Sequence, residues 1–191
     1  MINLTLDEAK KIAAEGDYKV IPISCEFFSD VKTPIEVLRI LKNISRHVYM
    51  LESIEDNEKW GRYTFLGYDP KLELACLKGK MTIKNGTTIE MDIRHPGEMI
   101  KKILADYKSP KLEHLPPFTG GLVGYFAYDY ICYAEPSLKL QAKDEENFKD
   151  VDLMLFDKVI AFDNYRQKII CIVNAKTEDI DRAYNRAVIE L

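Results

Sequence analysis

The sequence predicts an α+β fold with largely antiparallel, orthogonally packed β-sheets and helices on their outer faces. Four segments carry apolar residues at helical spacing, and eight or nine shorter segments are rich in β-branched and aromatic residues. The predicted strands mostly follow one another through hairpins and do not alternate with helices, as a parallel sheet would require. The chain has 191 residues, and 47% of them are apolar, so it is large enough to bury a core.

The helices are predicted from their ends and from their apolar spacing. Thr5-Leu6-Asp7-Glu8 and Thr33-Pro34-Ile35-Glu36 are capping boxes, and Gly16 ends the first helix. Further helices are expected around Met99 to Tyr107 and over Glu178 to Leu191. The second helix is expected to be buried on a wide face, which consists of Ile35, Val37, Leu38, Ile40, Leu41 and Ile44. The last apolar stripe has no stop signal, which predicts that the sequence is a piece of a longer protein.

The strands are predicted from apolar runs between turn signals. Tyr18 to Phe27 contains Pro22, which is typical of an edge strand or a bulge. Asn85-Gly86 predicts a type I′ hairpin turn, because both residues tolerate a positive φ. Val151 to Phe162 and Lys168 to Val173 are expected to form one long hairpin. The other expected strands begin at Val48 and Trp60 or cover Leu72 to Leu77, Met81 to Ile83, Thr87 to Ile93 and Phe118 to Asp129.

Composition excludes several classes of function. The net charge is −4 and basic residues alternate with acidic ones, so we expect no nucleic-acid partner. The longest uncharged run, Leu115 to Tyr128, is too short to span a bilayer, and we expect a soluble, cytoplasmic protein without a membrane partner. The cysteines have neither metal nor redox spacing and are expected to be small buried hydrophobic residues: Cys25, Cys76, Cys132 and Cys171.

The residues predict no self-contained active site and no metal site. Asp152, Asp157 and Asp163 are five and six residues apart, which places neighbours on alternating faces of a hairpin. The histidines are isolated from nucleophiles and from one another, and are expected to have surface or capping roles: His47, His95 and His114. We therefore expect neither a catalytic residue nor a cofactor in this chain.

One stretch gathers polar groups at neighbouring strand ends. Val48 to Leu51 is predicted as a buried strand, and Glu52 and Ser53 follow it directly. After a charged link, Trp60 and Arg62 open the next strand. A carboxylate, a hydroxyl and a guanidinium at adjacent strand ends suit a small ligand that carries both an ammonium and a carboxylate.

Two motifs resemble the N-terminal part of anthranilate synthase component I. The first is Met50-Leu51-Glu52-Ser53 followed by Trp60-Gly61-Arg62-Tyr63-Thr64-Phe65-Leu66-Gly67, and the second is Pro117 to Asp129. Phe156-Asp157 and Phe162-Asp163 are similar to a third. The related aminodeoxychorismate synthase component I, of folate biosynthesis, stays an alternative. So does a non-catalytic scaffold or interaction module.

The resemblance implies the activity of a larger enzyme. That family is a lyase which converts chorismate and ammonia to anthranilate and pyruvate in tryptophan biosynthesis, with Mg²⁺ and with ammonia from a glutamine amidotransferase subunit. Its chorismate and Mg²⁺ residues lie in a C-terminal domain. Residues 1–191 are therefore expected to be a single N-terminal regulatory domain, inactive alone. Faces that normally pack on the absent domain would be exposed and would favour a homo-oligomer.

The resemblance also implies a pocket for L-tryptophan as feedback inhibitor. We assign Glu52 and Ser53 to the ammonium of the ligand and Arg62 to its carboxylate, while Tyr63 and Phe65 are expected to be core. The full set of expected ligand-binding residues is Leu51, Glu52, Ser53, Arg62, Phe118 and Gly120. Tryptophan would bind the inactive arrangement of the enzyme better and so draw it toward that state.

Overall fold

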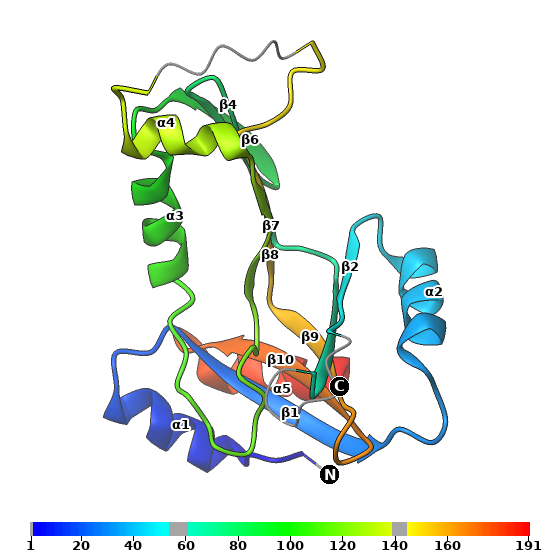
Figure 1. The fold of residues 1–191 in the computed structure, drawn as a ribbon. Coiled ribbons are helices and arrows are strands. Elements are labelled where there is room, and N and C mark those ends of the chain that lie inside the picture. The colour runs from blue at the N-terminus through cyan, green and yellow to red at the C-terminus, as the bar shows by residue number, and fades with distance from the viewer. Residues whose placement is uncertain (1, 54–60, 139–144) are drawn as a thin grey trace. The chain divides into compact units, whose positions relative to one another are not determined.

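The chain folds into two compact units, each with its own five-stranded antiparallel sheet (Figure 1). The structure is a computed structural model that describes residues 2–53, 61–138 and 145–191. The first unit contains Met1–Asp69, Asp106–Gly121 and Phe156–Leu191, and the second contains Pro70–Ala105 and Leu122–Leu155. The predicted α+β class and the antiparallel pairing are confirmed. The orthogonal packing of the sheets stays a prediction.

The described residues contain five α-helices, one short 3-10 helix and ten strands. The helices are α1 (Leu6–Glu15), α2 (Pro34–Ile44), α3 (Pro96–Ala105), η1 (Tyr128–Tyr130), α4 (Ile131–Ala134) and α5 (Ile180–Glu190). The strands are β1 (Val20–Phe28), β2 (Val48–Leu51), β3 (Tyr63–Tyr68), β4 (Leu72–Leu77), β5 (Lys80–Asn85), β6 (Thr87–Asp92), β7 (Gly121–Phe126), β8 (Val151–Phe156), β9 (Lys158–Asp163) and β10 (Lys168–Lys176). No described helix is long and apolar enough to cross a membrane.

The sheet of the first unit has the strand order β1-β10-β9-β3-β2. On one face, α1 and α5 pack around Ile21 and Ile23 of β1, and α2 packs around Leu66 of β3. The opposite face carries Phe65, against which Phe118 from the connector before β7 packs. The end of β2 therefore lies at the edge of a sheet that is covered on both faces.

Local signals set the helix ends of this unit as predicted. Both capping boxes form, with the Thr5 hydroxyl accepting from the Glu8 amide and the Thr33 hydroxyl accepting from the Glu36 amide. Pro22 lies in β1, an edge strand, as its missing N–H requires. The starts of α1 and α2 and the edge position of β1 thus depend on groups that lie within one helical turn or one strand.

The predicted wide buried face of α2 is wrong. Only Leu41 is fully buried, while Ile35, Ile40 and Ile44 are exposed. The apolar residues of α2 cover more of the helix than the edge of the sheet can bury, and one side of the helix has no partner among the described residues of this chain.

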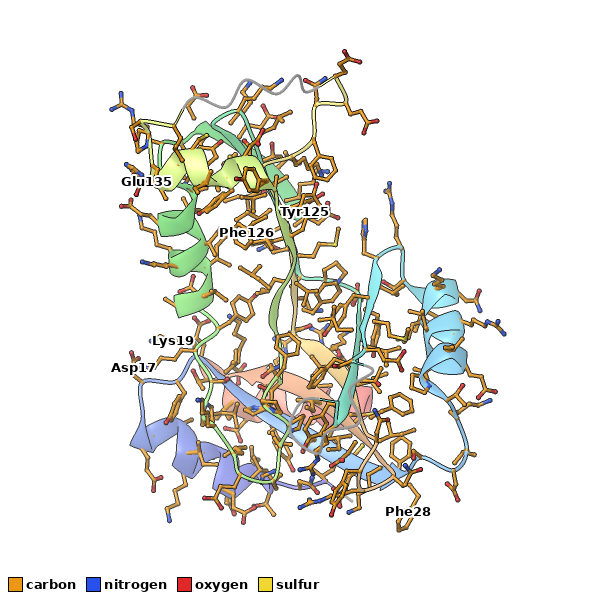
Figure 2. The ribbon with its side chains drawn as sticks, viewed as in Figure 1. Asp17, Lys19, Phe28, Tyr125, Phe126 and Glu135 are labelled. Carbon is orange, nitrogen blue, oxygen red and sulfur yellow. The ribbon has the colours of Figure 1, made fainter. Side chains whose placement is uncertain are left out.

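The sheet of the second unit has the order β6-β5-β4-β8-β7. Ile100 of α3 packs on Leu74 and Leu153 in the core of this unit. The outer strand β7 presents Tyr125 and Phe126, and 51% of Phe126 is exposed (Figure 2). The sheet is thus packed through its central strands and has an aromatic edge.

The predicted turn between β5 and β6 is corrected. Gly86 has a positive φ of 69° but Asn85 does not, so the β5–β6 turn is not type I′. The type I′ turn joins β4 to β5 instead, where Lys78 and Gly79 have φ values of 49° and 80°. Tyr133 accepts a hydrogen bond from the Gly79 amide at 2.8 Å and so helps to hold this turn.

The predicted long hairpin from Val151 to Val173 is also wrong in its first half. β8 pairs with β4 in the second sheet, whereas β9 pairs with β10 and β3 in the first. The chain changes sheet at Asp157, whose carbonyl accepts the backbone N–H of Asn174 at 2.9 Å. Both halves are buried, so an apolar run alone does not reveal the change.

Candidate functional site

The candidate site predicted from the sequence is the end of β2 and the start of β3. β2 pairs antiparallel with β3, and Leu51 lies opposite Phe65. Glu52 and Ser53 follow β2 and are exposed, as is half of Leu51. The expected buried strand is therefore a half-buried edge strand. Trp60 lies outside the described residues.

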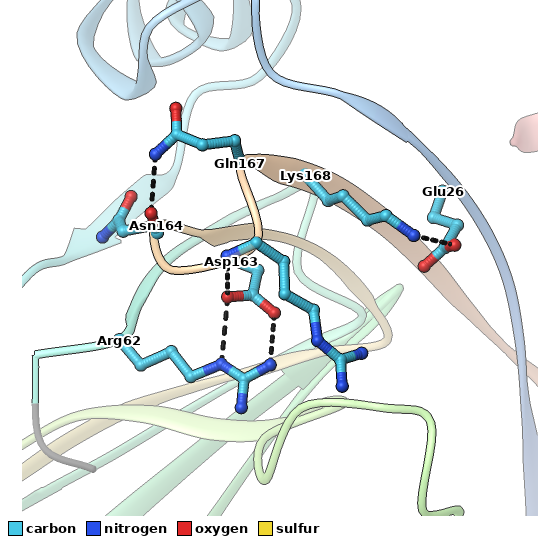
Figure 3. A network of polar contacts seen from close by, with 7 residues as sticks. Glu26, Arg62, Asp163, Asn164, Gln167 and Lys168 are labelled. Atoms are coloured by element: carbon cyan, nitrogen blue, oxygen red, sulfur yellow. Dashed lines mark hydrogen bonds and ion pairs between the residues drawn. The ribbon is translucent and has the colours of Figure 1, made fainter. Parts of the chain in front are cut away.

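Arg62 is held by a carboxylate from β9 (Figure 3). Its Nε and Nη2 donate to the two carboxylate oxygens of Asp163 at 2.9 and 2.6 Å. Asp163 is only 2% exposed, and the backbone N–H of Arg166 donates to it at 3.1 Å. Burial raises the pKa of Asp163, but these hydrogen bonds outweigh burial and leave the pKa below its ordinary value.

This pairing changes how Arg62 can take part in binding. The Nε–Nη2 edge that would hold a ligand carboxylate in a bidentate contact is on Asp163. The guanidinium also lies over the ring of Tyr63, 4.9 Å from the ring centroid. The structure thus gives Arg62 a structural role at the start of β3, and its predicted contact with the ligand stays a prediction.

Glu52 is tied to a second polar chain. The buried Thr64 hydroxyl donates to Glu52 Oε1 at 3.4 Å, and Asn164 Nδ2 donates to the same hydroxyl at 3.3 Å. The backbone N–H of Asn164 donates to the Arg62 carbonyl at 2.8 Å. The β9–β10 turn therefore orients both the carboxylate at the end of β2 and the residue that opens β3.

An aromatic row lies on the opposite face of this sheet from Thr64. Tyr63 and Phe65 stack at 5.7 Å between ring centroids, and Phe118 meets Phe65 edge-on at 5.7 Å. Leu51 lies opposite Phe65 in the register and so shares this face. The structure brings Leu51 and Phe118 to one face, while Glu52 reaches toward the other.

Gly120 is explained by close packing. A Cβ on Gly120 would come within 2.6 Å of Asn174 Nδ2 and 3.0 Å of the Phe156 carbonyl oxygen. That Asn174 amide donates to the Thr119 carbonyl at 2.7 Å. Close packing is thus found here, at the residue directly before β7, and the predicted place of Gly120 at a pocket border stays a prediction.

Tyr49 is a polar residue of this site that the sequence did not single out. Its ring packs edge-on against Phe156 at 4.7 Å and lies over Gly67. Its hydroxyl is buried and has no hydrogen-bond partner among the described residues, and burial raises its pKa. A buried hydroxyl without a hydrogen-bond partner can be recognised only in a structure, so Tyr49 could not be singled out from the sequence.

The described residues hold no group of three or more His, Cys, Asp or Glu side chains that could bind a metal ion. The geometry of the site suits ligand binding. Glu52 and Ser53 place an exposed carboxylate and hydroxyl at the end of β2, and the neighbouring Leu51 shares a face with aromatic side chains. Such a set suits a small zwitterionic ligand with an apolar side chain.

Comparisons with known proteins give one consistent result. No protein-family model matches the sequence. Curated relatives named anthranilate synthase component 1 include those of Acetivibrio thermocellus (38% identical over 187 residues), Acinetobacter calcoaceticus (36% over 193) and Aquifex aeolicus (34% over 190). These alignments cover 96%, 98% and 96% of this chain but only 37%, 38% and 38% of the relatives.

A solved structure agrees with these relatives. Anthranilate synthase component I from Streptococcus pneumoniae is 26% identical with a TM-score of 0.50, and the match covers 86% of this chain and 36% of that one. Over nearly its whole length, the chain is therefore homologous to the N-terminal region of anthranilate synthase component 1.

Proposed function

We propose that this chain is the N-terminal, tryptophan-binding part of an anthranilate synthase component 1. The observation that carries the proposal is similarity over 94–98% of the chain to relatives of that name. The whole protein would convert chorismate and ammonia to anthranilate and pyruvate. Mg²⁺ and the contact with a glutamine amidotransferase subunit would belong to the whole protein as well.

The proposed ligand contact lies at the end of β2. Glu52 would accept hydrogen bonds from the ammonium of L-tryptophan, and Ser53 would add a second polar contact. Thr64 orients Glu52 from the buried side, so the carboxylate is positioned before the ligand arrives. The apolar part of the ligand would lie on the side of Leu51.

Regulation would follow from a difference in affinity. Tryptophan inhibits only if it binds an inactive arrangement of the whole protein more tightly than the active one. The end of β2 supplies one part of such a pocket, and the remainder would come from the other part of the enzyme. The 191-residue chain alone would then bind tryptophan weakly.

The test uses the full-length gene product. We expect anthranilate to form from chorismate with ammonia, or with glutamine once the glutamine amidotransferase subunit is added, and tryptophan to inhibit this reaction. Ser53→Ala should weaken tryptophan binding about tenfold, because a hydrogen bond to a charged group is lost. Ser137→Ala, at an exposed position of the second unit, is the matched control and should leave binding unchanged.

Other outcomes would identify other functions. Formation of aminodeoxychorismate without inhibition by tryptophan would assign the protein to folate biosynthesis. Absence of any reaction with chorismate, in a protein shown to be folded, would favour a scaffold. Normal tryptophan binding by the Ser53→Ala variant would remove Ser53 from the pocket while leaving the enzyme assignment intact.

A further inference from the structure

Two cysteines face each other across β1 and β10, which lie side by side in the first unit (Figure 1). Cys25 and Cys171 are direct partners in the antiparallel register, so both side chains lie on the same face of the sheet. Because the two cysteines are far apart in the sequence, their spacing alone could not predict this pairing.

The ladder fixes the kind of pair they form. The backbone N–H of Ser29 donates to the Gln167 carbonyl at 3.0 Å, and that of Thr177 donates to the Lys19 carbonyl at 3.1 Å. Hydrogen-bonded and non-hydrogen-bonded pairs alternate along an antiparallel ladder, so Cys25 and Cys171 form a hydrogen-bonded pair. The Cα atoms of such a pair are about 5.5 Å apart, which lies inside the range of disulfides.

The surroundings leave room for reaction at this pair. Both cysteines are half-buried and reduced. The Cys25 thiol lies 4.0 Å from the Leu191 carbonyl oxygen at the end of α5. A cavity of about 40 Å³ borders Cys171 and Leu191, the residue whose carbonyl oxygen the Cys25 thiol contacts, and it can hold a molecule as small as hydrogen peroxide beside the pair.

We propose that Cys25 and Cys171 are a modification site, which a peroxide oxidises to a reversible cross-strand disulfide. The Cys25 sulfur attacks one peroxide oxygen, the O–O bond breaks, and Cys25 sulfenic acid and one water form. The Cys171 sulfur then attacks the Cys25 sulfur, and the hydroxyl leaves as a second water with the Cys171 proton. The two thiols together lose two electrons and two protons, and the peroxide gains them.

The order of the two steps follows from burial. Burial, with the Cys25 thiol beside it, raises the pKa of the Cys171 thiol to about 12, so Cys171 is a poor first nucleophile. Cys25 therefore reacts with the peroxide, and Cys171 resolves the sulfenic acid that lies directly opposite. In this second step the short distance between the two sulfur atoms compensates for the small fraction of Cys171 that is a thiolate.

The disulfide would be easily reduced. The Cβ atoms of a hydrogen-bonded pair are near 5.5 Å apart, whereas a relaxed disulfide needs about 3.8 Å. The strands must twist locally to close the bond, and strained disulfides have the more oxidising potentials of labile, regulatory bonds. The site is therefore suited to a reversible response rather than to structural stabilisation.

The chain contains its own control pair. Cys76 is buried in the second unit with its sulfur 3.5 Å from the Tyr133 hydroxyl, and Cys132 lies in the short helix α4. Neither residue faces another cysteine across a strand pair. Both should keep their thiols under conditions that join Cys25 to Cys171.

The experiment treats the 191-residue chain with hydrogen peroxide, blocks remaining thiols with N-ethylmaleimide and maps unreduced peptides by mass spectrometry. We expect the loss of two of the four thiols and a peptide that joins Cys25 to Cys171 and lacks two hydrogen atoms. Dithiothreitol should restore both thiols. A Cys76→Ser, Cys132→Ser double variant should give the same linked peptide.

Single variants test the order of reaction. In Cys171→Ser, Cys25 should accumulate as a sulfenic acid that dimedone labels. In Cys25→Ser, Cys171 should keep its thiol. The proposal would be overturned if N-ethylmaleimide still blocked Cys25 and Cys171 after peroxide treatment of the unmodified chain. Disulfides that form only between molecules would overturn it as well. The mapping of the unmodified chain decides this even if a variant fails to fold.

Discussion

Arg62 and Asp163 are 101 residues apart in the sequence and form two hydrogen bonds of 2.9 and 2.6 Å. Asp163 is the last residue of β9, and Arg62 immediately precedes β3. The pair thus ties the beginning of β3 to the end of its neighbouring strand, beside the proposed ligand contact at Glu52. Asp163, which is not among the predicted ligand-binding residues, can in this way set the geometry of the site.

Asp163→Asn should destabilise the first unit. Removing the carboxylate leaves the guanidinium of Arg62 without its partner charge, and we expect a loss of about 2 kcal/mol in the free energy of unfolding. Urea unfolding at neutral pH measures this loss. Asp30→Asn, at an exposed position, is the matched control and should change stability little.

The same pair predicts a pH dependence. The pKa of Asp163 is below its ordinary value in the folded chain, so its contribution to stability is complete above the unfolded pKa of about 4. That contribution is lost as the pH falls through the folded pKa. The stability difference between the unmodified chain and Asp163→Asn should therefore be constant near neutral pH and shrink in acid. A difference that grows on acidification would contradict this assignment.

Tyr49→Phe should stabilise the chain. The Tyr49 hydroxyl is buried without a hydrogen-bond partner among the described residues, and removing it should gain about 1 kcal/mol. Tyr133→Phe is the matched contrast, because its hydroxyl accepts from the Gly79 amide and donates to Asp150. That variant should lose about 2 kcal/mol. Equal changes in the two urea midpoints would show that Tyr49 has a partner in solution.

Thr64→Val should weaken tryptophan binding in the full-length protein. The substitution keeps the shape of a fully buried side chain but removes the hydroxyl that donates to Glu52. We expect about a threefold to tenfold rise in the dissociation constant for tryptophan, measured by calorimetry, with little change in the Michaelis constant for chorismate. Thr88→Val, at an exposed position of β6, is the control.

Gly124→Ala should be poorly tolerated. A Cβ at Gly124 would come within 2.0 Å of the Asp152 carbonyl oxygen, which belongs to the backbone of β8 and cannot rotate away. We expect a loss of about 3 kcal/mol in unfolding free energy. At Gly86 nothing lies within 4 Å, so Gly86→Ala should cost only the strain of its positive φ, about 1 kcal/mol. The urea midpoints of the two variants compare these costs.

Features that depend on neighbouring residues could be predicted from the sequence. The capping boxes at Thr5 and Thr33 involve groups three residues apart, and both form. Pro22 indicated an edge strand because a missing N–H is a local property. The candidate site could be placed between β2 and β3 because its polar groups directly follow an apolar run.

Features that depend on distant partners could not be predicted. The pairing of Asp163 with Arg62 was not predicted, because nothing near Asp163 in the sequence indicates Arg62 as its partner. The outer face of α2 has the same apolar composition as the buried one, so periodicity could not tell which is covered. The change of sheet at Asp157 lies within a continuous apolar run, and the pairing of Cys25 with Cys171 requires the register of β1 and β10.

The strand order of the first sheet has a consequence for synthesis on the ribosome. Val20–Phe28 pairs with Lys168–Lys176, and Tyr63–Tyr68 pairs with Lys158–Asp163, whereas every strand of the second sheet lies between Leu72 and Phe156. The second sheet can therefore form while Val20–Phe28 still lacks its partner strand. The interval between the synthesis of Phe28 and that of Lys168 is on the order of ten seconds at ordinary translation rates. During it the apolar strand Val20–Phe28 is unprotected, so chaperone binding and aggregation of nascent chains should concentrate on this segment.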